Sequence, residues 1–378
     1  MSVLDVVLTG WAVAATLFSG VAGVRLSLRA RRRDGPPASM RSETLPEVPV
    51  LLLRPLDQPT PRECDNLALP LPSHVRQIVL SPARFGVSLA LEWMPSDPRC
   101  ANRKVGHVLH ALATLDAAEV EQARVLVVDS DVAVDAALVD ALVSGLSSGA
   151  DLCWAAPDVE SGKSFAGKAL AGLLNQTHHS FVALEAMSVG AKAVCGKALG
   201  LGARAQRELG RLGEHIGEDL ELSARLHLSG ATVQLASARA RIPRDDTYRW
   251  STAVSRMTRW MQVLRSHRPA LSPTVPLLFT PTVPLVVLAL LVQTTPVSVA
   301  VVGLVLVRVL LAQVLAGGER GTRREALFDW FLGELLLAVA FAYAFGRRTV
   351  SWRGNSFTLE PGGRMARRAP LSAAEVVR

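Results

Sequence analysis

The sequence predicts an α/β protein whose doubly wound, mostly parallel mixed sheet is flanked by transmembrane helices. Short Val- and Leu-rich runs alternate with helical patterns through the middle of the chain, which is typical of a sheet covered by helices on both faces. Of the 378 residues, 49% are hydrophobic, and the apolar excess is concentrated at the two ends of the chain. Roughly 20 consecutive apolar residues span a bilayer, and both ends contain such stretches.

The first apolar stretch, Val3 to Val24, carries one charge, Asp5, and a basic cluster follows it between Arg25 and Arg33. Basic residues directly after an apolar span mark the cytoplasmic side of a membrane. A cleaved signal peptide would instead carry its positive charge before a shorter apolar core. The pattern therefore favours an uncleaved anchor over residues 1–25 with its N-terminus outside, followed by a basic, Pro-rich linker over 26–47.

The net charge is +8 and the pI is about 9.9. Much of this basic excess flanks apolar segments, at 29–33, 320–324 and 347–353, where an anionic leaflet attracts it. The composition therefore indicates contact with a bilayer and not with nucleic acid. The cysteines are widely spaced and form no Cys-x-x-Cys pair, which predicts neither a zinc site nor a disulfide scaffold and fits a domain that faces the cytosol. They are Cys64, Cys100, Cys153 and Cys195.

Residues 48–268 are predicted to form the α/β domain. Val-rich runs too short for a helix predict strands, and longer runs with apolar residues three and four apart predict helices. The expected strands are Val48–Leu53, Val75–Leu80, Val87–Leu91, Arg124–Val128, Asp151–Ala155, Lys192–Cys195 and Thr232–Ala236. The expected helices are Arg103–Leu115, Asp135–Ser147, Phe165–Met187, Leu220–Leu228 and Trp250–Arg265.

Residues 269–346 are predicted to form C-terminal membrane segments, with apolar stretches at Leu277–Val292, Val297–Ala316 and Leu327–Phe345. Three full crossings would place the basic tail, 347–378, outside, against the tendency of positive charge to stay inside. Either this tendency fails or one segment is interfacial or re-entrant. The candidates for such a segment are Leu277–Val292, which prolines break, and Leu327–Phe345, which contains acidic residues. We expect the tail on the cytosolic side.

The strand Arg124–Val128 ends on two carboxylates, Asp129 and Asp131. Ligands of open α/β sheets bind at the carboxyl ends of the strands. Asp-x-Asp at such a position offers the hard oxygen ligands that Mg²⁺ or Mn²⁺ prefers, with substrate phosphate oxygens completing the shell. The competing interpretation is that the two aspartates only begin the helix that follows.

Two further motifs lie downstream. Gly217-Glu218-Asp219 opens a helix, and Arg256 and Arg259 lie three apart on another, where they share one face and are followed by Trp260. Guanidinium groups bind diphosphates well, and a carboxylate at the mouth of a crevice can serve as a base. The alternatives are that the acidic pair only favours a helix N-terminus, that the arginines form a solvated or lipid-facing basic face, and that the tryptophan anchors at the interface.

The order of these motifs resembles the membrane-bound family 2 type glycosyltransferases with a GT-A fold. Among these, the chain looks most like the ceramide glucosyltransferases and their bacterial relatives, including the hopanoid-associated glycosyltransferases. The resemblance extends from about Val48 to Gly363 and includes, besides the three motifs, Leu52-Leu53-Arg54-Pro55-Leu56 with Asn66-Leu67, Asn102-Arg103-Lys104-Val105, and Thr349-Val350-Ser351-Trp352-Arg353-Gly354.

The resemblance implies an inverting transfer of a hexose, glucose from UDP-glucose being the first expectation, to a hydroxyl of a membrane lipid such as ceramide or a hopanoid. The enzyme would be an integral protein of the inner membrane with its catalytic domain facing the cytosol. Asp131 and Asp129 would bind Mg²⁺ or Mn²⁺, and both would join Lys104 and Arg54 in holding the donor. By the same resemblance, the catalytic residues would be Asp219 as the base, Arg256, Arg259 and Trp260.

The sequence departs from this family in one respect, because no acidic residue follows the second strand. Val79-Leu80 leads into Ser81-Pro82-Ala83-Arg84, and the nearest later aspartate is Asp97. Two alternatives therefore stay open. A processive polysaccharide synthase would carry Gln where Arg256 stands and more membrane spans, and a non-catalytic membrane scaffold would have lost its donor site.

Overall fold

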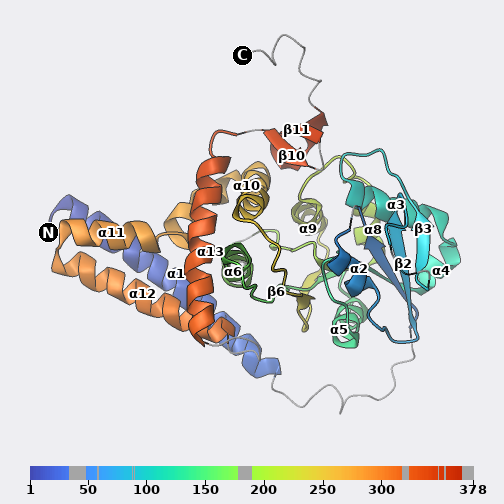
Figure 1. The fold of residues 1–378 in the computed structure, drawn as a ribbon, viewed down its shortest axis with the longest axis horizontal. Helices are drawn as coiled ribbons and strands as arrows, with labels where there is room; N and C mark the ends of the chain where they lie inside the picture. Colours follow the sequence, from blue (N-terminus) through green and yellow to red (C-terminus); the bar gives the residue numbers. More distant parts are fainter. Residues whose placement is uncertain are drawn as a thin grey trace, which may run out of the picture.

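The computed structural model describes residues 1–33, 48–57, 59–86, 88, 90–177, 190–316, 323–347, 349–352 and 355–367. It confirms the α/β prediction, with a sheet domain on one side and a bundle of apolar helices on the other (Figure 1). The end of the predicted linker, the C-terminal end of the tail and the second half of the helix expected up to Met187 lie outside the described residues.

The main sheet has seven strands in the order β3-β2-β1-β4-β7-β5-β8. All neighbouring strands are parallel except β7, which runs antiparallel to both β4 and β5. The strand order reverses between β1 and β4, and in open α/β sheets such a point is where ligands bind. The strands are β1 Val50–Pro55, β2 Val75–Ser81, β3 Glu92–Pro95, β4 Arg124–Val128, β5 Leu152–Trp154, β7 Ala198–Leu201 and β8 Val233–Leu235.

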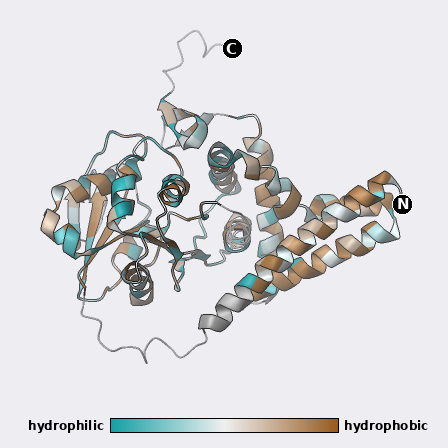
Figure 2. Ribbon diagram, turned by 180° about the vertical axis from the view of Figure 1, so that it is seen from behind, coloured by the Kyte–Doolittle hydropathy of each residue, from teal (hydrophilic) through white to brown (hydrophobic). Residues whose placement is uncertain are grey.

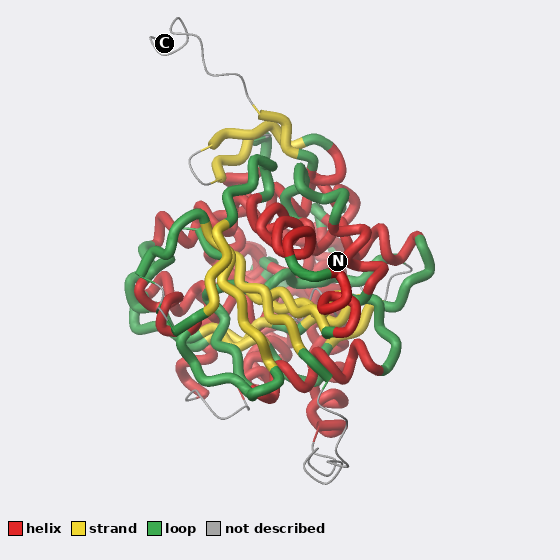
Figure 3. The backbone as a smooth tube through the Cα atoms, turned by 90° about the vertical axis from the view of Figure 1, so that its right-hand side faces the viewer, coloured by secondary structure: helices red, strands yellow, loops and turns green. Residues whose placement is uncertain are grey.

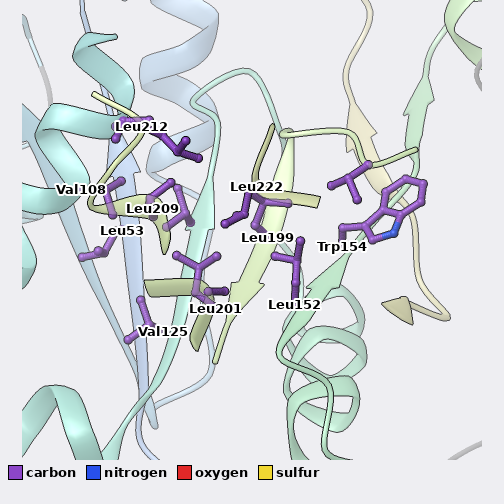
Figure 4. Close-up of a cluster of buried hydrophobic side chains, with 14 of the residues drawn as sticks. Leu53, Val108, Val125, Leu152, Trp154, Leu199, Leu201, Leu209, Leu212 and Leu222 are labelled. Atoms are coloured by element: carbon purple, nitrogen blue, oxygen red, sulfur yellow. The ribbon is translucent and has the colours of Figure 1, made fainter. Parts of the chain in front are cut away.

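Helices cover both faces of this sheet because its strands are apolar on both sides (Figure 3). Leu53 and Val125 face a core shared with α3 and α8, and Figure 4 shows Leu53 beside Val108 and Leu222 beside Leu199 in the same cluster. Leu52 and Leu126, one residue away, face α5 instead. The covering helices are α2 Pro61–Leu67, α3 Arg103–Thr114, α4 Ala117–Gln122, α5 Ala136–Ser147, α8 Ala203–Leu209 and α9 Glu218–Leu228.

Most predicted elements match the structure within a few residues, and two do not. The third strand is Glu92–Pro95 and not Val87–Leu91, and no strand forms at Lys192–Cys195, because the paired segment is Ala198–Leu201. Smaller elements surround the sheet: β6 Pro157–Val159 pairs with β9 Ala240–Ile242, and α6 Phe165–Gly172 continues into a π-helical turn, η2 Leu173–Thr177.

In the part of the chain that the structure describes, three helices are long and apolar enough to cross a membrane, namely α1 Val3–Arg33, α12 Thr295–Ala316 and α13 Arg323–Ala344. A further pair, residues 269–279 and α11 Thr282–Val292, is bent by 53° and could form a broken span or a re-entrant loop. In Figure 1, α1, α11 and α12 run side by side, and Figure 2 shows this bundle as strongly hydrophobic. The N-terminal end meets the α11–α12 turn, where Thr294 donates to Asp5 at 3.0 Å.

Helix α13 lies across this bundle, between it and the sheet domain (Figure 1). Leu332, Leu336 and Leu337 of α13 pack with α6, with α10 Trp250–His267 and with the π-helical turn η4 Val275–Phe279. Its acidic residues, Glu325, Asp329 and Glu334, also distinguish it from α12, which has none. Helix α13 is nevertheless long and apolar enough to cross a membrane, so the expectation of one non-crossing segment among the C-terminal ones stays a prediction.

The chain after α13 returns to the sheet domain. A three-stranded antiparallel sheet forms from β10 Thr349–Trp352, β11 Asn355–Leu359 and β12 Met365–Arg367. The amide of Ile216 donates to the Gly363 carbonyl at 2.9 Å, and Gln262 of α10 donates to the Thr349 carbonyl at 2.8 Å. The described residues of this small sheet therefore contact the sheet domain, and the cytosolic side of the tail stays a prediction.

Two glycines let α6 approach α13 closely. A Cβ at Gly172 would overlap the backbone carbonyl of Asp329, and a Cβ at Gly333 would lie 2.5 Å from the Leu173 amide nitrogen. We expect Gly172→Val to lower the melting midpoint of the detergent-purified protein by several degrees, since overpacking costs about 1–3 kcal/mol. Gly303→Val in α12 is the control, because no atom lies within 4 Å of its Cβ. Equal midpoints for both variants would contradict this close contact.

Candidate active site

The two aspartates of the Asp-x-Asp motif follow β4 at the point where the strand order reverses. Arg54 of β1 holds this loop from below, since its guanidinium donates to the carbonyls of Val132 at 2.8 Å, Asp129 at 3.2 Å and Ser130 at 3.4 Å. Arg54 is 0% exposed and does not line the cavity described below. Its buried position makes it a positioning residue for the loop, and its contact with the donor stays a prediction.

Lys104 reaches the motif from the first turn of α3. Asn102 caps this helix by accepting from the Val105 amide, and its amide group also donates to Glu218 at 3.0 Å. The ammonium of Lys104 lies 2.8 Å from Asp129 Oδ1 and 3.2 Å from Glu218 Oε1. The Asn-x-Lys motif thus joins the Asp-x-Asp loop to the start of α9.

A second lysine, Lys197, lies directly before β7. Its ammonium is 2.6 and 2.8 Å from the two carboxylate oxygens of Asp131 and 3.0 Å from Asp129 Oδ2. Burial alone would raise the pKa of Asp129, but Lys104 and Lys197 hold it well below its ordinary value. Asp129 is therefore ionised at neutral pH and a poor proton acceptor.

Asp219 lies in the first turn of α9, where its Oδ2 accepts from the Gly196 amide at 2.7 Å and its Oδ1 from the Leu220 amide at 2.9 Å. Gly217 precedes the helix with φ +71°, and a Cβ there would overlap Val263 of α10. Burial and the neighbouring Glu218 raise the pKa of Asp219 to about 6. Of the carboxylates around this site, Asp219 is thus tuned to accept a proton near neutral pH.

The two arginines of α10 both line the cavity. Arg256 donates to the Tyr248 hydroxyl at 2.6 Å and lies 3.8 Å from Asp131 Oδ2. Arg259 forms no hydrogen bond or ion pair with any residue in the described parts of the chain, and burial together with Arg256 lowers its pKa. Trp260 also lines the cavity and packs against the apolar cluster of α6 and α13.

These side chains share one cavity of about 590 Å³. Its charged part contains Lys104, Asp129, Asp131, Lys197, Glu218, Asp219, Arg256 and Arg259. Its apolar part comes from the cluster where the sheet domain meets the membrane helices, and is lined by Leu170, Leu173, Leu174, Trp260, Met261, Leu264, Val275, Phe279 and Leu337. The cavity therefore connects a site built for anions and proton transfer with an apolar surface at the membrane helices.

The Asp-x-Asp carboxylates do not fit a resident divalent metal in this arrangement. Each of their four oxygens lies within 3.0 Å of a lysine ammonium. Mg²⁺ binds carboxylate oxygens at about 2.0–2.1 Å, so it would displace the lysine or meet its positive charge. Within the described residues, no group of three or more His, Cys, Asp or Glu could hold a metal. We therefore derive no chemical step through a metal.

Sequence reasoning missed several residues of the cavity. Asp57 follows β1, lines the cavity, and pairs with Arg103 at 3.0 Å and His107 at 3.3 Å. Ser81 ends β2 and accepts from the Trp93 indole at 3.0 Å, whereas Asp97 pairs with Arg103 at 2.7 Å and lies outside the cavity lining. Lys197 and Tyr248 carried no recognisable motif. A lysine directly before a buried strand is the one signal that could have identified Lys197.

Comparison with known proteins agrees with this geometry. A search of curated protein sequences found no match to the chain. The family model described as glycosyl transferase family 21 matches residues 87–365, which contain the Asn-x-Lys, Asp-x-Asp, Gly-Glu-Asp and Arg-x-x-Arg-Trp motifs. The match covers most of the chain and confirms the resemblance to ceramide glucosyltransferases. The chain, whose described helices include ones apolar enough to cross a membrane, belongs to glycosyl transferase family 21, whose members transfer a sugar from a nucleotide-sugar donor to an acceptor.

Proposed function

We propose that this protein transfers a hexose, first of all glucose from UDP-glucose, to a hydroxyl of a membrane lipid, with inversion at the anomeric carbon. The observation that carries this proposal is the cavity that joins the charged site to the apolar surface at the membrane helices. A lipid acceptor needs both parts, because its tail must stay in an apolar environment while its hydroxyl reaches the sugar.

Asp219 is the proposed base. It takes the proton of the acceptor hydroxyl as that oxygen forms a bond to the anomeric carbon, and the bond from this carbon to the diphosphate breaks on the opposite side. A pKa of about 6 leaves Asp219 mostly ionised at pH 7 but still basic enough to receive the proton. Asp129, whose pKa is depressed by two lysines, is less suited to this step.

The diphosphate is proposed to lie against the cations of the cavity. Arg259 has no partner among the described residues and is free to bind an anion, and Arg256, Lys104 and Lys197 add charge beside it. Guanidinium and ammonium groups that are fixed in place stabilise the negative charge that develops on a departing diphosphate. The family carries an acidic residue after the second strand, β2, and this chain does not. Asp57 follows the neighbouring strand, β1, and is the proposed contact for the nucleobase.

The acceptor is proposed to enter from the membrane side. Trp260 lies between the arginines of α10 and the apolar cluster, where its ring can contact both sugar and lipid. A ceramide-like or hopanoid-like acceptor suits this surface equally. The proposed orientation places the sheet domain at the cytosolic face of the inner membrane, because the basic flanks of α1 favour that side.

The prediction that Asp129 and Asp131 bind Mg²⁺ or Mn²⁺ stays a prediction. Such an ion would supply positive charge that neutralises the negative diphosphate. In this arrangement Lys197 and Lys104 lie where the ion would bind.

Lipid mass spectrometry of a heterologous host tests the function. The host is fed ceramide and hopanoid acceptors and expresses the unaltered protein, Asp219→Asn or Glu221→Gln. Glu221 lies on the same helix, pairs with Arg225 at 2.8 Å and does not line the cavity, so it is a matched control. A new hexosyl lipid with the unaltered protein and Glu221→Gln, but not with Asp219→Asn, is expected. Identical lipids from all three strains would contradict the proposal, and a sugar polymer would indicate a polysaccharide synthase.

A further inference from the structure

Lys197 is fixed in its position by the main sheet and is not a mobile surface lysine. Its carbonyl accepts from the Asp129 amide at 2.9 Å, which extends the β4–β7 pairing by one step beyond Val128 and Ala198. The side chain is 11% exposed, and both of its carboxylate partners are about a quarter exposed. The backbone therefore places the ammonium between Asp129 and Asp131 in the same way that it places the aspartates themselves.

The ammonium occupies the position at which Asp-x-Asp would bind a divalent cation. It contacts both oxygens of Asp131 and one of Asp129, and Lys104 contacts the remaining one. Arg256 adds a third cation, 3.8 Å from Asp131. A divalent ion on the same oxygens would lie close to these charges, where the repulsion in a partly buried site is large. Lysine and metal therefore exclude each other at these carboxylates.

We propose that Lys197 replaces the divalent metal of the Asp-x-Asp site, so that this protein binds its nucleoside-diphosphate donor without a metal ion. The inference rests on the proposed function, because it requires such a donor. The donor's diphosphate lies against Lys197, Lys104 and the arginines of α10, and the aspartates hold the lysine in place of an ion. An ammonium donates up to three hydrogen bonds, which lets Lys197 be shared between Asp131 and a phosphate oxygen.

Removing this charge is expected to restore an open metal site. In Lys197→Met, the cation that stays beside Asp131 among the described residues is Arg256 at 3.8 Å, and the Asp131 oxygens become free to bind an ion. The variant should therefore bind Mn²⁺ in the absence of nucleotide, whereas the unaltered protein should not. It should also bind UDP at least about tenfold more weakly than the unaltered protein in EDTA, and Mn²⁺ should recover most of that loss.

Calorimetry with UDP and with Mn²⁺ on the full-length protein in detergent tests the proposal. The variants are Lys197→Met, Lys197→Arg and, as a control, Lys192→Met, whose ammonium donates to the Val233 carbonyl at 2.9 Å and does not line the cavity. For the unaltered protein, the UDP dissociation constant in EDTA should equal that in Mn²⁺ within about threefold. Lys197→Arg keeps the charge and should bind UDP in EDTA, which separates the loss of charge from a loss of folding.

Two results would overturn the inference and leave the proposed function intact: UDP binding by the unaltered protein that requires Mn²⁺, or equal UDP binding in EDTA by Lys197→Met and the unaltered protein. The unaltered protein could instead fail to bind UDP both with and without Mn²⁺. That result would contradict the proposed UDP-sugar donor, and it would also contradict the inference about Lys197.

Discussion

Asp219→Asn is expected to lower the rate of sugar transfer by about 10²–10⁴-fold and to leave the UDP dissociation constant within about threefold of its original value. Asn has the same shape and keeps one oxygen to accept from the Gly196 amide, so the loop that carries Lys197 should stay in place. The variant loses the ability to take the acceptor's proton, together with the second acceptor oxygen, which binds the Leu220 amide in the unaltered protein. Radiolabelled hexose transfer and UDP calorimetry on the same preparations measure the two effects separately.

The pH dependence of the unaltered protein provides a second measurement of the same group. A base must be ionised to accept a proton, so kcat/KM should fall about tenfold per pH unit below the Asp219 pKa of about 6 and level off above it. Glu221→Gln should show the same profile, because Glu221 does not line the cavity. Transfer by Asp219→Asn within tenfold of the unaltered protein, or a flat profile down to pH 4, would exclude Asp219 as the base.

The sequence predicted those parts of the site in which a motif lies next to the strand or helix that positions it. Arg124–Val128 is a buried strand by composition, and the carboxylates that follow it had to emerge at the carboxyl edge of the sheet, where Asp129 and Asp131 lie. The helix start at Glu218 and the shared face of Arg256 and Arg259 follow from spacing alone. These parts of the site depend on contacts within a few residues of each motif, which is why they could be predicted.

The remaining parts depend on contacts between distant segments. Lys197 reaches the aspartates because Ala198–Leu201 inserts antiparallel between β4 and β5, and this short strand contains Gly200, which weakens its pattern. Arg54 was expected to hold the donor because of the family resemblance of Leu52-Leu53-Arg54-Pro55-Leu56. The fold instead buries it under the loop, where backbone carbonyls satisfy it. The position of α13 across the bundle depends on packing at Gly172 and Gly333, which no hydropathy pattern encodes.

Arg308→Met is expected to produce the largest loss of stability outside the sheet domain. Arg308 of α12 pairs with Glu334 of α13 at 2.8 Å, and both side chains are almost fully buried. Its guanidinium also donates to the carbonyls of Leu278 and Phe279, in the bent segment before Thr282. Removing one member of a buried ion pair costs about 3–5 kcal/mol, because the other charge stays buried and unpaired. The melting midpoint in detergent should fall accordingly.

The double variant Arg308→Met with Glu334→Gln should recover part of this loss, since it no longer buries a lone charge. Leu306→Met is the control on the same helix, because Leu306 is exposed to the surroundings of the bundle. A midpoint for Arg308→Met equal to that of Leu306→Met would show that the ion pair does not hold the bent segment.

The same ion pair is relevant to the acceptor, because Val275 and Phe279 of the bent segment line the apolar part of the cavity. A broken helix in a bilayer persists only where its free backbone groups find partners, and Arg308 and Glu334 supply them. We therefore expect Arg308→Met to raise the KM for the lipid acceptor more than the KM for the nucleotide sugar. Equal changes in both would indicate general unfolding, whereas a selective change would connect this buried pair directly to acceptor binding.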